Sequence, residues 1–117
     1  MYRNQNPEGK PAILIYIPEG FLQKNTLEFV THGIEEEGIF YFVEEIKGKT
    51  DAKALSAEAS LASRLDVGLG FDLNGDIALN YQRMTYPLYH IKSTSTADEF
   101  RNIGVNAARL VKGVPLI

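Results

Sequence analysis

Three consecutive carboxylates, Glu35, Glu36 and Glu37, form the densest charge in the sequence, within the stretch GIEEEG at residues 33–38. Such a run could meet a divalent cation or a basic surface of a partner protein. It lies where an amphipathic helix is expected to end at Gly38, and the C-terminal end of a helix disfavours negative charge. A solvated acidic helix end is the structural alternative, and the residues alone leave the two readings about equal.

The other reactive side chains form no recognisable catalytic motif. His32 and His90 lack the spacing of metal-binding histidine motifs, and no nucleophile elbow frames a serine. Gly68 and Gly70 fall within a predicted strand that leads into a hairpin, so close backbone packing explains them better than a nucleotide-binding loop. The sequence therefore predicts a protein without an active site of its own.

Composition limits the class of protein. The chain has 117 residues, of which 44% are hydrophobic and 23% charged, as expected for one globular domain. The net charge of −3 and the scattered cations disfavour binding to nucleic acid. There is no cysteine, which excludes disulfides and thiolate metal sites and suits a reducing cytoplasm. No apolar stretch is long enough to span a membrane.

We expect residues 1–11 to be a flexible N-terminal tail and residues 12–117 to form a single domain. Strand and helix patterns alternate along this domain. The alternation predicts an α/β fold with three α/β/α layers and a mixed, mostly parallel five-stranded sheet containing one antiparallel strand. The predicted strands cover residues 12–18, 39–46, 66–71, 77–82 and 86–91, and the predicted helices cover residues 25–37, 51–65 and 97–112.

Local signals mark several boundaries of these elements. Asn25, with Glu28 three residues later, is the expected cap of the first helix, and Thr96 opens a capping box before the last helix. Asn74-Gly75 predicts a tight hairpin, which makes the strand after it antiparallel.

The first predicted helix has two distinct faces. Its apolar residues form one narrow stripe that should face the sheet. These residues are Leu27, Val30 and Ile34. Phe29, His32 and Glu36 fall together on the opposite face and should point to solvent. An aromatic ring beside a carboxylate on an outer face is typical of a partner-binding surface.

The stretches GIEEEGI (residues 33–39) and NAARLVKGVP (residues 106–115) together resemble the small subunits of reactivating factors for adenosylcobalamin-dependent diol and glycerol dehydratases. The resemblance covers the chain from Ala12 onward. It implies a subunit that is not an enzyme by itself and that pairs with a large, Hsp70-like ATPase subunit. It also implies the fold of the dehydratase medium subunit. That medium subunit is exchanged during reactivation, so that damaged cobalamin leaves the inactivated dehydratase.

The resemblance also implies roles for individual residues. Glu36 matches the family glutamate that reaches a Mg²⁺ site next to ADP or ATP on the large subunit, so this chain alone is expected to bind no cofactor. Glu35 and Glu37 flank it, and Phe29 and His32 share its face, so these four residues are the expected partner contacts. Phe40 stands where the family pattern has a proline.

Two alternatives remain open at this stage. The chain could be the medium subunit of the dehydratase itself, although a longer N-terminal segment is expected there. It could also be a free-standing ligand-binding domain of doubly wound type, which would need convergent polar groups beyond the strand ends. The resemblance implies a cytoplasmic protein and leaves association with a bacterial microcompartment open.

Overall fold

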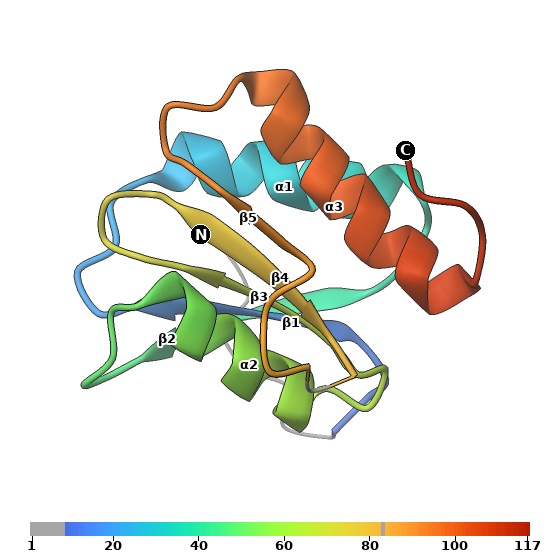
Figure 1. Cartoon of the computed structure of the whole chain (residues 1–117), viewed down its shortest axis with the longest axis horizontal. Coiled ribbons are helices and arrows are strands. Elements are labelled where there is room, and N and C mark those ends of the chain that lie inside the picture. Colours follow the sequence, from blue (N-terminus) through green and yellow to red (C-terminus); the bar gives the residue numbers. More distant parts are fainter. Residues whose placement is uncertain (1–8, 83) are drawn as a thin grey trace.

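The chain forms five strands and three helices in the order that the sequence predicts (Figure 1). The structure is a computed structural model that describes residues 9–82 and 84–117, so most of the predicted flexible tail (residues 1–8) lies outside the described residues. The elements are β1 (Ile13–Pro18), α1 (Lys24–Glu36), β2 (Tyr41–Ile46), α2 (Ala52–Ala62), β3 (Val67–Phe71), β4 (Ile77–Tyr81), β5 (Tyr89–Ile91) and α3 (Ala97–Lys112). Within the described ranges, no helix combines the length and the apolar character needed to cross a membrane.

The five strands form one mixed sheet in the order β2-β1-β3-β4-β5. Strand β1 pairs in parallel with β2 and β3, whereas β4 pairs antiparallel with β3 and β5. The prediction of an α/β fold with a five-stranded mixed sheet is therefore confirmed.

The predicted hairpin joins β3 to β4. Gly75 has a φ of 99°, a left-handed conformation that glycine adopts without strain. The Asp72 carboxylate accepts hydrogen bonds from the backbone N–H groups of Asn74, Gly75 and Asp76, at 2.9 to 3.0 Å. This turn chemistry reverses the chain and fixes β4 as an antiparallel strand.

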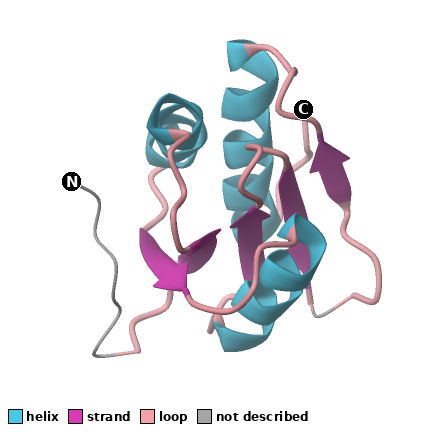
Figure 2. Cartoon of the chain, turned by 90° about the vertical axis from the view of Figure 1, so that its left-hand side faces the viewer, coloured by secondary structure: helices cyan, strands magenta, loops and turns pink. Residues whose placement is uncertain are grey.

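The helices cover both faces of the sheet, with α1 and α3 on one face and α2 on the other (Figure 1). Side chains alternate along β1 accordingly. Ile13, Ile15 and Ile17 enter the core beneath α1 and α3, and Leu14 and Tyr16 join a smaller cluster with residues of α2. A side view shows the three helices packed around the twisted strands (Figure 2).

Helix α3 has the caps that the sequence predicts. The Thr96 hydroxyl accepts from the backbone N–H of Glu99, the Glu99 carboxylate accepts from the backbone N–H of Thr96, and Gly113 ends the helix at a φ of 70°. The cap predicted for α1 is wrong, because this helix begins at Lys24, before Asn25. Phe21, shortly before the helix, is buried, and Gln23 occupies the N-cap without a side-chain hydrogen bond.

Three other elements are at least two residues shorter than predicted. Strand β2 starts at Tyr41, and β5 starts only at Tyr89, after a proline that has no backbone N–H to donate. Helix α2 ends at Ala62 because Ser63 turns to an extended conformation, with a ψ of 130°. There its hydroxyl donates to the carbonyl of Ala12 at 2.7 Å.

Candidate functional site

The acidic turn, defined as Glu35, Glu36 and Glu37, is formed by the end of α1. Helix α1 stops at Glu36, and Gly38 follows with a φ of 76°. The backbone N–H of Gly38 donates to the carbonyl of Glu35 at 3.0 Å, which is the closing pattern of a glycine-terminated helix. The predicted end of this helix is thus confirmed, and three carboxylates gather where the helix dipole disfavours them.

Helix α3 lies directly against α1 next to this turn. A Cβ atom added to Gly33 would lie 2.1 Å from the carbonyl oxygen of Arg101, and one added to Gly104 would lie 2.0 Å from the carbonyl oxygen of Val30. The two helices therefore cross with their backbones in contact, which only glycine permits. This crossing holds α3 beside the acidic turn.

Cationic side chains of α3 compensate the charge of the acidic turn. Arg101 Nη1 lies 2.8 Å from Glu36 Oε1. Lys112 Nζ lies 2.7 Å from Glu37 Oε1 and also donates to the Glu37 carbonyl at 3.1 Å, and Arg109 Nε lies 3.5 Å from the same carboxylate. The unfavourable charge at the end of α1 is thus offset within the chain.

The three glutamates have different surroundings. Glu37 is the least exposed, at 16%, and its pKa is lowered by the hydrogen bond from Lys112, with a smaller contribution from Arg109. Glu35 accepts a hydrogen bond from the neutral Tyr41 hydroxyl of β2 at 3.1 Å. Glu36 is half-exposed and in the described part of the chain has one cationic partner, Arg101. Glu35 and Glu36 are therefore the carboxylates of the turn that an incoming group could reach, and Glu36 is the one of these two that is paired with a cation.

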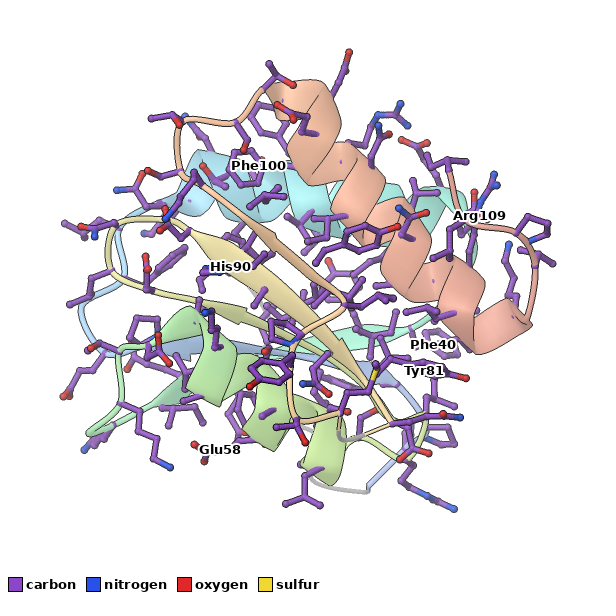
Figure 3. All side chains as sticks on the ribbon, in the orientation of Figure 1. Phe40, Glu58, Tyr81, His90, Phe100 and Arg109 are labelled. Carbon is purple, nitrogen blue, oxygen red and sulfur yellow. The ribbon has the colours of Figure 1, made fainter. Side chains whose placement is uncertain are left out.

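The last residues of the chain are attached to the same region. The amide of buried Asn106 donates to the carbonyl of Ile117 at 3.1 Å and accepts from its backbone N–H at 2.8 Å. Arg109 donates to the carbonyl of Pro115 at 3.0 Å, and Figure 3 shows its side chain at the C-terminal half of α3. Arg109 therefore connects residues 114–117 to Glu37 of the acidic turn.

The outward face predicted for α1 is observed. Leu27, Val30 and Ile34 are buried beneath the helix. Phe29 and His32 are exposed together with Glu36, although the ring of Phe29 is only 38% accessible. Phe40, just after the acidic turn, is 78% exposed and is labelled in Figure 3. It is a more accessible aromatic than Phe29, and no role was predicted for it from the sequence.

The cations that meet the acidic turn were not predicted from the sequence. No contact with the glutamates was expected for Arg101, Arg109 or Lys112. Their spacing carries a signal, because residues eight and eleven positions after Arg101 return to the same side of a helix. A pairing between the first and last helices would have been needed to bring that side to the glutamates.

A complete metal site is not formed by the described residues. They contain no group of three or more His, Cys, Asp and Glu side chains that could hold a metal ion. A single half-exposed carboxylate such as Glu36 fits the role of one ligand to Mg²⁺, which keeps waters and takes its other ligands elsewhere. A Cβ atom on Gly68 or Gly70 would lie 2.1 to 2.4 Å from backbone atoms of α2, which confirms close packing there.

Comparisons with known proteins point to one group. A family model described as the dehydratase medium subunit matches residues 10–117. The small subunit of the propanediol dehydratase-reactivating factor of Citrobacter freundii is 35% identical over 107 residues, covering 90% of this chain and 89% of that protein. Among solved structures, a glycerol dehydratase reactivase matches with a TM-score of 0.88 and 31% identity, over 92% of this chain and 97% of that chain. A diol dehydratase-reactivating factor complexed with ADP and Mg²⁺ matches with a TM-score of 0.81 and 31% identity, over 92% and 98% of the two chains.

Proposed function

The chain belongs to the small-subunit family of diol and glycerol dehydratase-reactivating factors, and we propose that it works by subunit exchange with the medium subunit of the dehydratase. It pairs with a large ATPase subunit, and together they release damaged cobalamin from the inactivated enzyme. One observation carries the proposal: this chain matches the family model of the dehydratase medium subunit over almost its whole length. Two proteins of one fold can compete for one binding surface.

The outer face of α1, together with the acidic turn, is the proposed contact with the large subunit. Glu36 supplies one ligand to Mg²⁺ next to ADP or ATP on that subunit, as its exposure and single ion pair allow. Phe29 and His32 lie on the same face. Glu35 and Glu37 contact the partner at the edges, where Tyr41 and the cations of α3 hold them in place.

The chain contributes binding and no chemistry in this proposal. The nucleotide and most of the Mg²⁺ ligands belong to the large subunit, in keeping with a structural relative that is a complex with ADP and Mg²⁺. We expect the purified small subunit neither to hydrolyse ATP nor to bind it at micromolar concentrations. Calorimetric titration of this chain alone with ATP measures this directly, and micromolar binding would contradict it.

A second candidate is the medium subunit of the dehydratase itself, which the description of the matching family favours. The first proposal is favoured because this chain matches 89% and 97% of the length of two proteins that are named as a reactivating factor small subunit and a reactivase. Pull-down from the native cytoplasm separates the two, because a reactivase subunit recovers a large ATPase subunit and a medium subunit recovers dehydratase.

Displacement tests the exchange. Labelled small subunit is bound to the large subunit with Mg²⁺ and ADP, and purified dehydratase is then added. Competition for one site predicts release of the label in proportion to the dehydratase added. If the label stays bound, or if a complex of all three forms, the exchange proposal is wrong.

Glu36→Ala tests the site within the same assay. Assembly and its dependence on Mg²⁺ should weaken, whereas thermal stability should stay within about 0.5 kcal/mol of wild type, since exposed ion pairs contribute little. A large loss of thermal stability with unchanged affinity for the large subunit would show that Glu36 has a structural role instead.

A further inference from the structure

We propose that Arg101 competes with the divalent cation for the carboxylate of Glu36, so that their ion pair sets the cation concentration at which the small subunit docks. The proposal rests on the function proposed above for Glu36 and concerns the control of that site. Arg101 acts here as a regulatory residue that occupies the carboxylate until the cation displaces it.

Geometry distinguishes this pair from the others in the acidic turn. Arg101 Nη1 and Glu36 Oε1 lie 2.8 Å apart, which is the distance of a charge-assisted hydrogen bond. Glu37, by contrast, is held by both Lys112 and Arg109 and is less exposed than Glu36. Displacing one exposed partner is much easier than displacing two, so Glu36 is the carboxylate that can change partners.

The helix crossing keeps Arg101 permanently within reach. The carbonyl oxygen of Arg101 lies against Gly33, one turn before Glu36 on α1. The backbones cannot separate without breaking this contact, so the local concentration of guanidinium near Glu36 is high and constant. Mg²⁺ must compete with a cation that is already part of the fold.

Because both side chains are exposed, the ion pair should change the required Mg²⁺ concentration only modestly. The side chains of Arg101 and Glu36 are 40% and 49% exposed. Exposed ion pairs shift equilibria by up to about fivefold, and salt screens them. A threshold of this size adjusts docking without preventing it. A guanidinium and Mg²⁺ bound at the same carboxylate repel each other, so docking and the intrachain pair oppose each other.

The test is a titration of assembly with Mg²⁺ at low salt, with full-length small subunit, purified large subunit and ADP. Arg101→Gln should lower the Mg²⁺ concentration for half-maximal assembly by about two- to fivefold. Lys49→Gln is the matched control, because it also removes one positive charge from an exposed ion pair, in this case with Glu58 of α2. The shift should be absent in Lys49→Gln, and it should disappear when Arg101→Gln is combined with Glu36→Gln.

The outcomes separate this inference from the function on which it rests. If Arg101→Gln behaves like Lys49→Gln, or weakens assembly, the competition is wrong, while a Mg²⁺ dependence that is lost in Glu36→Gln still supports the proposed role of Glu36. If Glu36→Gln leaves the Mg²⁺ dependence unchanged, the proposed metal contact itself is wrong.

Discussion

The two faces of the sheet are covered by different helices, α1 and α3 on one and α2 on the other. Glycines allow close backbone packing on both faces, but the charged side chains differ between them. On the first face, Gly33 and Gly104 bring two helix backbones into contact. On the second, Gly68 and Gly70 bring strand β3 against the backbone of α2. The first face adds three carboxylates and three cations at one crossing, whereas on the second an exposed ion pair joins Lys49, before α2, to Glu58 of α2.

The comparison separates packing signals from binding signals. Glycines serve close approach on both faces, so a glycine pattern by itself says nothing about a ligand here. The glutamates of the acidic turn and the cations of α3 gather on the α1–α3 face, where partly exposed ion pairs join them. That asymmetry supports the proposal that the α1–α3 face, and not the α2 face, contacts the large subunit.

The largest expected effect tests the shared packing. Gly104→Ala on the first face and Gly68→Ala on the second should each lower the free energy of unfolding by about 3 kcal/mol, since the added methyl group meets backbone atoms that cannot move aside. Urea unfolding measures both. If one variant is as stable as wild type, the two faces do not depend on the same close contact.

The next effect should separate the faces in binding. Phe29→Asp should weaken affinity for the large subunit by on the order of 2 kcal/mol or more, about 30-fold in Kd, if the ring is a buried anchor in the complex. Leu61→Asp is the control, because Leu61 is an exposed apolar residue of α2, accessible at 60%. Both variants should stay folded. Equal loss of affinity from both substitutions would remove the distinction between the faces.

Buried hydrogen bonds that attach a chain segment to a helix should contribute similarly to stability on the two faces. Asn106→Ala removes two hydrogen bonds to the backbone of Ile117, and Ser63→Ala removes the bond to Ala12 that joins α2 to the start of β1. Each should cost about 1–2 kcal/mol, the usual cost of an unpaired buried polar group. Chemical denaturation gives the two values, and amide exchange at Ile117 should rise only in Asn106→Ala.

The smallest effects should appear at opposite ends of the pH scale. Lys112 and Arg109 lower the pKa of Glu37 below 4.5, so the stability it adds is present above about pH 4.5 and is lost as the pH falls through the lowered pKa. Burial, followed by Glu44 and Glu58, raises the pKa of Tyr16 to about 12, so its contribution is present below pH 10 and is lost as the pH rises towards 12.

Two variants check these assignments. Glu37→Gln should flatten the acid limb of the denaturation midpoint plotted against pH, and Tyr16→Phe should flatten the alkaline limb. A change in the alkaline limb from Glu37→Gln would show that the two faces are electrostatically coupled.

Much of the fold could be predicted because its signals are local. The Asn74-Gly75 turn, the Thr96 capping box and the apolar stripe of α1 each depend on residues within a few positions of one another. The start of α1 was missed because Gln23 occupies the N-cap without a side-chain hydrogen bond, so no local capping signal marks it.

The candidate site was only half predictable for the same reason. The glutamates are adjacent in sequence, but their cations come from the last helix. Gly33 and Gly104 were the available sign of a close helix crossing, since glycine within a helix carries a cost that packing must repay. Nothing in a single sequence says that those two helices are the ones that cross.

The long sequence separation of the ion pairs has a consequence for synthesis on the ribosome. Glu36 and Arg101 are 65 positions apart, and Glu37 and Lys112 are 75 apart. Because chains emerge from the N-terminus, the acidic turn leaves the ribosome well before α3 exists. During that interval the growing chain carries three uncompensated carboxylates and an uncovered stripe of α1. The final helix therefore completes the core and neutralises the acidic turn in one late step.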